Sequence, residues 1–144
     1  MEVRRCGPSG GNGGHEFADD AIVPGERVSE VRIRAGRTVD AVQIIHKNAS
    51  GARHEFSQHG GNGGDLHVFT LDENEFITGI SGRFGATVDS ISIHTTRQSS
   101  PRFGGGGGNA DYHYECPEDC EIVGFVGRAG RTIDAIGVIM RRHA

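Results

Sequence analysis

The 144-residue sequence lacks any hydrophobic run that approaches the length of a membrane-spanning segment. Its first residues, Met1 to Cys6, also lack the apolar core that a secretory signal peptide carries. These two absences argue against membrane insertion and against classical secretion of the chain as written. We therefore expect a cytoplasmic protein, or one that is released without a classical signal.

A strong excess of charge is lacking as well. The formal net charge is −4 at pH 7, and no basic block stands out along the chain. The most basic cluster, Arg141-Arg142-His143, is typical of a solvated tail. Nucleic acids and anionic membrane surfaces attract proteins with basic patches, so the sequence argues against both as main partners.

Cysteine is scarce, with three residues in the chain. Cys116 and Cys120 flank a short turn, and Cys6 is far away in the sequence. A structural zinc site needs about four ligands, and there is no second cysteine pair to complete one. We interpret Cys116 and Cys120 as a turn-flanking pair, able to form a local disulfide in an oxidising compartment. Neither a metal site nor a cofactor is predicted.

Glycine, by contrast, is abundant, and many of its 24 residues fall into three short loops. The loops span residues 10–14, 60–64 and 104–108. The first glycine of each loop precedes the glycine of a Gly-x-x-x-Asp motif by 26, 25 and 26 residues, respectively. The motifs read GRTVD at 36–40, GATVD at 85–89 and GRTID at 130–134. This constant spacing indicates one domain, residues 1–144, with three internal repeats at about 1–48, 49–97 and 98–144.

Alignment of the three motif aspartates reveals five positions that are apolar in every repeat and mostly β-branched. They are Val28, Ile77 and Ile122; Val31, Ile80 and Phe125; Val39, Val88 and Ile133; Val42, Ile91 and Ile136; and Ile44, Ile93 and Val138. β-Branched residues at alternating positions are typical of strands, and no window shows a convincing helical stripe. We predict an all-β fold of about twelve strands. Three four-stranded antiparallel sheets, one from each repeat, would form a three-sided prism with pseudo-threefold symmetry.

The repeated motifs point to a polar ligand. Glycine loops can cradle phosphate, but a nucleotide site would need a following Lys-Ser/Thr pair or a helix, and neither follows these loops. A single aspartate after a turn could simply cap the local backbone. Three aspartates at constant spacing from glycine loops favour a clamp for the vicinal hydroxyls of a sugar, since glycine lets the ring come close.

Catalysis is not predicted. A hydrolase would need a second carboxylate at catalytic distance or a Ser/His/Asp set. His15, His59 and His67 lie next to glycine loops, but no histidine repeats with all three aspartates. We interpret these histidines as exposed polar residues and expect no catalytic residue.

Three segments carry a family resemblance: GGNGG at 10–14, ISGRFG at 80–85 and GFVGRAGRTIDAIG at 124–137. Over essentially its whole length the chain resembles the jacalin-related lectins, which have the β-prism I fold. The resemblance implies that each sugar site joins a motif turn to the glycine loop of an adjacent repeat. Carried over to this sequence, the three sites are Asp134, Arg131 and Thr132 with Gly14; Asp40, Arg37 and Thr38 with Gly64; and Asp89, Ala86 and Thr87 with Gly108.

The resemblance also suggests a ligand class. Single, uncleaved chains of the family bind mannose or glucose, so we expect mannose-type glycans and glycoproteins as partners. A galactose-type lectin, an acidic-glycan lectin and a non-catalytic interaction scaffold remain as alternatives, and homo-oligomerisation is left open. Many family members carry an aromatic residue or an aspartate at the variable motif positions, where this chain has threonine, arginine or alanine. The third loop has Gly106 in place of asparagine, so we expect it to be the least preorganised.

Overall fold

The computed structural model describes residues 2–143, which form thirteen β-strands and no helix. The strands are β1 (Val3–Gly10), β2 (His15–Ala18), β3 (Arg27–Ala35), β4 (Val39–Lys47), β5 (Arg53–Glu55), β6 (His59–Gly60), β7 (Asp65–Thr70), β8 (Ile77–Phe84), β9 (Ser90–Thr95), β10 (Phe103–Gly104), β11 (Ala110–Glu115), β12 (Cys120–Ala129) and β13 (Ile133–Arg142). The described part of the chain accordingly offers no helix long and apolar enough to cross a membrane. The prediction of an all-β fold is confirmed.

Three hairpins, β3–β4, β8–β9 and β12–β13, form the centre of the fold, and each begins its return strand at or next to a motif aspartate. The hydrogen bonding groups the strands into one sheet of eight and one of five, where three separate sheets were predicted. The larger sheet has two halves, which meet where Ile77 of β8 pairs with Ile122 of β12. This pairing joins two of the expected sheets into one.

The prediction that each repeat builds its own sheet is wrong. The outer strands β1 and β2 of the first repeat pair with β13 and β12 of the third. In the same way β7 pairs with β3, and β11 pairs with β8. The physical reason is that each glycine loop crosses the end of a hairpin. The strand before the loop pairs with the second strand of that hairpin, and the strand after the loop pairs with the first. Each hairpin is therefore flanked by strands from another repeat.

The core lies between the sheets and draws on all three repeats. Every side chain at the five aligned apolar positions is at most 3% exposed, as the period-2 pattern predicts. Phe125 is the largest of the fully buried side chains. Because the hairpins share this core, their turns are held in fixed positions relative to one another.

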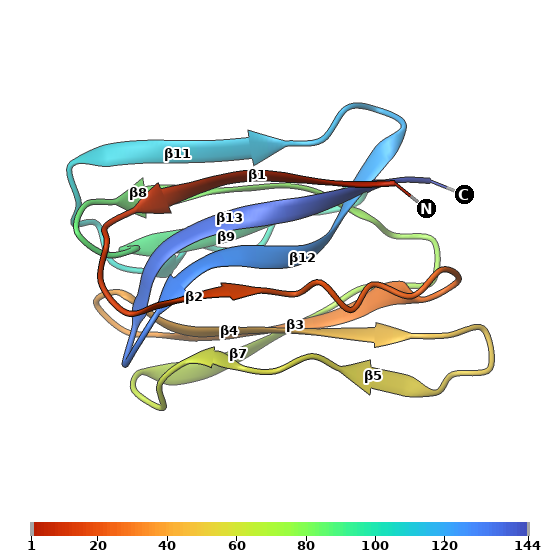
Figure 1. Ribbon diagram of the computed structural model, residues 1–144, viewed down its shortest axis with the longest axis horizontal. Coiled ribbons are helices and arrows are strands. Elements are labelled where there is room, and N and C mark those ends of the chain that lie inside the picture. The colour runs from red at the N-terminus through yellow and green to blue at the C-terminus, as the bar shows by residue number, and fades with distance from the viewer. Residues whose placement is uncertain (1, 144) are drawn as a thin grey trace.

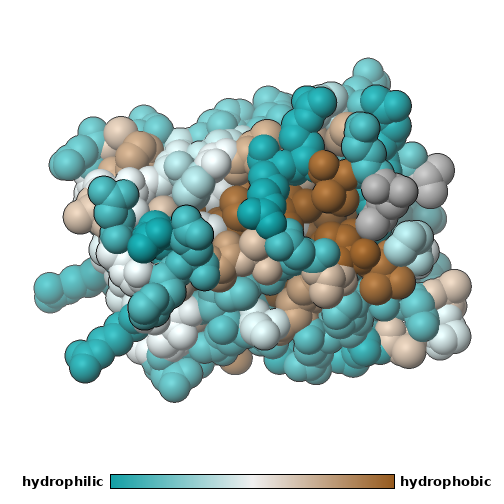
Figure 2. Space-filling view, in the orientation of Figure 1, coloured by the Kyte–Doolittle hydropathy of each residue, from teal (hydrophilic) through white to brown (hydrophobic). Residues whose placement is uncertain are grey.

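The two ends of the molecule differ in character. Figure 1 shows the chain termini together at the right-hand end, where β1 runs beside β13, and the connections between β1 and β2 and between β12 and β13 at the left-hand end. Figure 2 shows a largely hydrophilic face, with a hydrophobic area toward the end that carries the termini. The glycine loops and the motif turns therefore occupy the end opposite the termini.

Candidate functional site

Each motif forms a tight turn at the end of its hairpin. The motif glycine donates its N–H to the carbonyl oxygen of the threonine two residues later, at 2.9–3.0 Å in the three copies. The aspartate lies two residues after the threonine, at or next to the start of the return strand. Its side chain is half-buried in each copy, whereas Arg37, Ala86 and Arg131 at the first variable position are exposed. Each turn thus carries one half-buried carboxylate and one exposed residue at the first variable position, which we call the rim residue.

A glycine loop crosses each of these turns, and the aspartate backbone fixes where it begins. The carbonyl oxygens of Asp134, Asp40 and Asp89 each accept an N–H from the second loop glycine at 2.9 Å. These donors are Gly11, Gly61 and Gly105, respectively. The pairing implied by the family resemblance is therefore what the backbone forms: the loop at 10–14 with Asp134, the loop at 60–64 with Asp40, and the loop at 104–108 with Asp89.

The carboxylates lie directly against the last two glycines of these loops. A Cβ atom built on Gly13 would lie 2.6 Å from Oδ1 of Asp134, and one on Gly14 would lie 2.7 Å from Oδ2. The other two loops approach Asp40 and Asp89 in the same way, with corresponding distances of 2.6–2.9 Å. Gly14 also has a φ of 66°, which side chains rarely adopt. Glycine is therefore required here by both space and backbone conformation.

The three motif carboxylates are not used inside the protein. Within residues 2–143 none of them makes a side-chain hydrogen bond or an ion pair. Asp19 shows the contrast, since its Oδ1 lies 2.6 Å from Nε2 of His59 and its Oδ2 accepts the N–H of Phe125 at 2.9 Å. A half-buried carboxylate without an internal partner is available to accept hydrogen bonds from a ligand.

Three arginines hold the glycine loops, and the sequence analysis did not identify them. Arg128 donates from Nε to the carbonyl oxygen of Gly13 and from Nη2 to that of Gly14, both at 3.0 Å. Arg34 and Arg83 make the same pair of bonds to the loops at 60–64 and 104–108, at 3.0–3.1 Å. A signal was present, because each arginine stands two residues before a motif glycine.

The three turns meet at the end of the molecule. Val39 donates its N–H to the carbonyl oxygen of Val88 at 3.0 Å, and Val88 donates to that of Ile133 at 2.9 Å. Each loop also passes close to the rim residue of a second turn: a Cβ on Gly11 would lie 2.2 Å from the carbonyl oxygen of Ala86. The three carboxylate sites therefore lie side by side, with directly bonded backbones.

Two of the three histidines next to the loops differ from the expected exposed polar residues. His15 is exposed as predicted. His59, however, is half-buried: it bonds Asp19 and stacks on Phe17 with ring centroids 4.0 Å apart. His67 likewise stacks on the ring of Phe103. Sequence analysis missed these positions because the packing partners come from strands distant in the chain.

The cysteines remain free thiols in the structure. Burial raises the pKa of Cys116 to about 12, so this thiol is protonated at neutral pH. A protonated thiol is neither a nucleophile nor a metal ligand. Cys116 and Cys120 therefore flank their turn as expected from the sequence, without a disulfide between them in this structure.

The chain is similar to known proteins in both sequence and fold. The jacalin-like lectin domain matches residues 6–139. Horcolin from Hordeum vulgare subsp. vulgare is 32% identical over 110 residues, which cover 72% of this chain and 74% of Horcolin. Malaysian banana lectin superposes with a TM-score of 0.85 at 28% identity, covering 99% of this chain and 100% of that lectin. AcmJRL, a mannose-binding jacalin-related lectin from Ananas comosus, gives 0.84 at 26% identity, with 98% and 99% covered. The chain belongs to the jacalin-like lectin domain family of carbohydrate-binding proteins.

Proposed function

We propose that this lectin binds mannose- and glucose-type glycans through three sites, centred on Asp40, Asp89 and Asp134. The observation that carries the proposal is the recurrence, in all three repeats, of a half-buried carboxylate without an internal partner beside two loop glycines. A pseudo-threefold relation between the repeats would make the sites equivalent in design. Each site also has its own arginine that holds the glycine loop in place, and this recurrence supports the equivalence. The three residues are Arg34, Arg83 and Arg128.

The chemistry suits a sugar. A carboxylate accepts hydrogen bonds from two neighbouring hydroxyls at once, each worth about 1.5–3 kcal/mol because the acceptor is charged. Backbone N–H groups of the loop and of the motif turn would donate to the same hydroxyls. At the Asp134 site these would come from Gly14, Arg131 and Thr132. Each site supplies a single carboxylate, whereas hydrolysis of a glycosidic bond requires two, so we propose binding without catalysis.

The sugar class rests on two further points. The residues of β1 precede the first loop in one continuous chain, and uncleaved chains of this kind are the mannose-type members of the resembled family. AcmJRL, whose fold covers almost all of this chain, is a mannose-binding lectin. Both points favour mannose over galactose.

Competition on a mannose column tests the proposal. The protein should be retained in buffer containing EDTA, since the sites hold no set of the six to eight oxygen ligands that calcium requires. Methyl α-mannoside should elute it, and methyl α-galactoside at the same concentration should not. Equal elution by both sugars, or loss of retention in EDTA, would contradict the proposal.

A further inference from the structure

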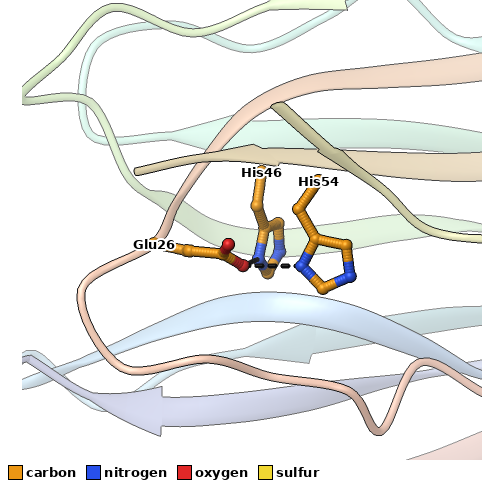
Figure 3. Close-up of side chains that lie close together, drawn as sticks. All are labelled: Glu26, His46 and His54. Carbon is orange, nitrogen blue, oxygen red and sulfur yellow. Dashed lines mark hydrogen bonds and ion pairs between the residues drawn. The ribbon is translucent and has the colours of Figure 1, made fainter. Parts of the chain in front are cut away.

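A second group of functional side chains lies on the same sheet as the Asp40 site, but near the opposite end of β4. Glu26 stands immediately before β3, His46 lies near the end of β4, and His54 lies on β5, directly paired with His46 across the two strands. One ligand atom from each residue lies within 4.8 Å of the other two. Figure 3 shows both imidazole rings turned toward the same carboxylate.

The distances within this cluster are short. Nδ1 of His54 lies 2.6 Å from Oε1 of Glu26, and Nδ1 of His46 lies 3.8 Å from the same oxygen. Phe56 packs against both rings, with centroid distances of 4.6 Å to His46 and 4.3 Å to His54. This packing fixes the ring orientations and keeps the two Nδ1 atoms directed at Glu26.

His46 is the informative member of the cluster. Its side chain is fully buried, and its Nε2 lies 2.8 Å from the carbonyl oxygen of Val123. Because a carbonyl only accepts, Nε2 carries the proton and Nδ1 of the neutral ring presents a lone pair. That Nδ1 is the one buried side-chain nitrogen or oxygen in residues 2–143 without a hydrogen-bond partner. Burial lowers the pKa of His46, which disfavours a second proton on the ring.

A lone pair facing a carboxylate oxygen with no proton between them is unfavourable, and the neighbouring guanidinium of Arg141 does not resolve it. Arg141 donates to the backbone carbonyl of Glu26 at 2.9 Å and pairs with the carboxylate of Glu121 at 3.3 Å. Its guanidinium is thus bound beside the cluster rather than within it. A cation placed among the three ligand atoms would satisfy both Nδ1 of His46 and the Glu26 carboxylate.

We propose that Glu26, His46 and His54 bind one divalent transition-metal ion, best matched by Zn²⁺. Two imidazoles and one carboxylate are a donor set that zinc takes, with water in the fourth position. Tetrahedral ligands about 2.0–2.2 Å from zinc stand roughly 3.3–3.6 Å apart, so small side-chain adjustments would bring these atoms into place. The carbonyl of Val123 supplies the second hydrogen bond that metal-binding histidines commonly make.

The site is open to an ion from solution. The side chain of His54 is 29% exposed and that of Glu26 is 13% exposed. Glu26 also lines a cavity of about 780 Å³, together with Phe76 and Arg141. An ion could therefore reach the cluster without unfolding the sheet.

The bound ion would act on the fold and not on the sugar. His46 and Asp40 both belong to β4, six residues apart, which is about 20 Å along a strand. Zinc would link the start of β3 to β4 and β5, far from the three carboxylate sites. We expect it to raise thermal stability and to leave glycan affinity unchanged.

Titration of the EDTA-treated, full-length protein with ZnCl₂ tests the site by calorimetry, with Co²⁺ absorption as a report on tetrahedral geometry. The wild type should bind one Zn²⁺ per chain. His54→Ala and Glu26→Gln should each weaken this binding by more than about 100-fold, because a direct ligand matters more than the outer partners that cost 10–100-fold. His113→Ala removes an exposed histidine of β11 outside the cluster and should change nothing.

Folding is checked in each variant by its mannoside affinity without metal, and these substitutions at partly exposed positions avoid altering the buried His46. Zn²⁺ should raise the Tm of the wild type and of His113→Ala, but not of His54→Ala or Glu26→Gln. Absence of a one-to-one wild-type complex would overturn the proposal. So would equal zinc affinity in the wild type and His54→Ala, which would indicate scattered surface histidines as the ligands.

Discussion

Nη2 of Arg128 lies 3.0 Å from the carbonyl oxygen of Gly14, the glycine whose backbone faces the Asp134 carboxylate. The same guanidinium also binds Gly13, so one planar side chain fixes two successive peptide groups. A loop this rich in glycine loses much conformational freedom when it is ordered. The arginine therefore orders a loop whose own sequence would leave it flexible. The site is thus preorganised before a ligand binds.

This relationship predicts the effect of Arg128→Lys. Lysine keeps the charge but cannot bond two carbonyls with one planar group, so the loop should be less ordered. We expect mannoside affinity at the Asp134 site to fall by about threefold to tenfold, equivalent to about 0.7–1.4 kcal/mol. Calorimetry in an Asp40→Ala/Asp89→Ala background isolates that site.

Arg142→Lys is the matched control. Arg142 forms an exposed ion pair with Asp119 and takes no part in the loops. Its replacement should leave mannoside affinity unchanged. An equal affinity for Arg128→Lys and the wild type would show that the loop is ordered without the arginine.

Much of this fold follows from local sequence chemistry. The strands could be predicted because β-branched residues recur at the same five positions relative to each aspartate, and all of these side chains prove buried. The pairing of each loop with its turn was available only through family resemblance. This pairing depends on which hairpin end each loop crosses. Hydrophobic periodicity gives no information about such non-local contacts.

Other features could not be predicted from the sequence, for physical reasons. Burial of His46 depends on Val123, 77 residues away, and on Phe56 covering its ring. The joining of two expected sheets depends on one contact, Ile77 with Ile122. Arg34, Arg83 and Arg128 were different, since their register was visible in the sequence. Their role was hidden because an arginine in a strand is usually solvated.

Asp19 and Asp20 offer a comparison of a buried and an exposed carboxylate in adjacent residues. Asp19 is 3% exposed and accepts the N–H of Phe125, so Asp19→Ala leaves that buried donor unsatisfied. We expect it to lower the free energy of unfolding by about 1–3 kcal/mol. Asp20 forms an exposed pair with Arg5, and Asp20→Ala should cost less than about 1 kcal/mol. Urea denaturation measures the loss of stability in both variants. Equal losses would contradict a larger contribution from the buried Asp19 than from the exposed Asp20.

Glu75 predicts a pH dependence of stability. Burial by itself raises the pKa of this carboxyl, but hydrogen bonds from Thr95, the backbone N–H of Asp72 and Gln98 outweigh burial and hold the pKa below its ordinary value. A pKa lowered by folding stabilises the protein above the unfolded value, and this contribution is lost as pH falls through the folded value.

Glu75→Gln should therefore be less stable than the wild type near pH 7, and the difference should shrink as pH falls below about 4.5. Denaturation series at several pH values measure the gap between the two proteins. A gap that stays constant down to pH 3 would show that the ionised carboxylate is not the source of the stability.

The exposed rim residues predict a difference between the sites. Arg37 and Arg131 can pair with a sulfate or carboxylate beyond the primary sugar, whereas Ala86 cannot. Arg37→Ala and Arg131→Ala should weaken binding of a sulfated mannose oligosaccharide and leave methyl α-mannoside unaffected. Ala86→Arg should strengthen binding of the sulfated ligand. Titrations showing no change with any charged glycan would remove this role for the arginines.

The adjacency of the three turns predicts multivalent binding. A site of one carboxylate and a few backbone donors should bind a monosaccharide weakly, with a Kd near 1 mM or about −4 kcal/mol. Because Val39, Val88 and Ile133 hold the turns together, several branches of one glycan can reach different sites. Linked binding raises apparent affinity by about 10²–10⁴ without a new contact, provided that the branches span the distance.

Removal of the aspartates one at a time separates site affinity from linkage. Asp40→Ala, Asp89→Ala and Asp134→Ala should each lower the calorimetric stoichiometry from three monosaccharides to two and leave the affinity of the remaining sites unchanged. The same single variants should bind branched mannose glycans much more weakly, because linkage is lost together with one site. The triple variant should bind neither ligand. A wild-type stoichiometry of one sugar per chain, or sugar binding by the triple variant, would contradict three aspartate-centred sites.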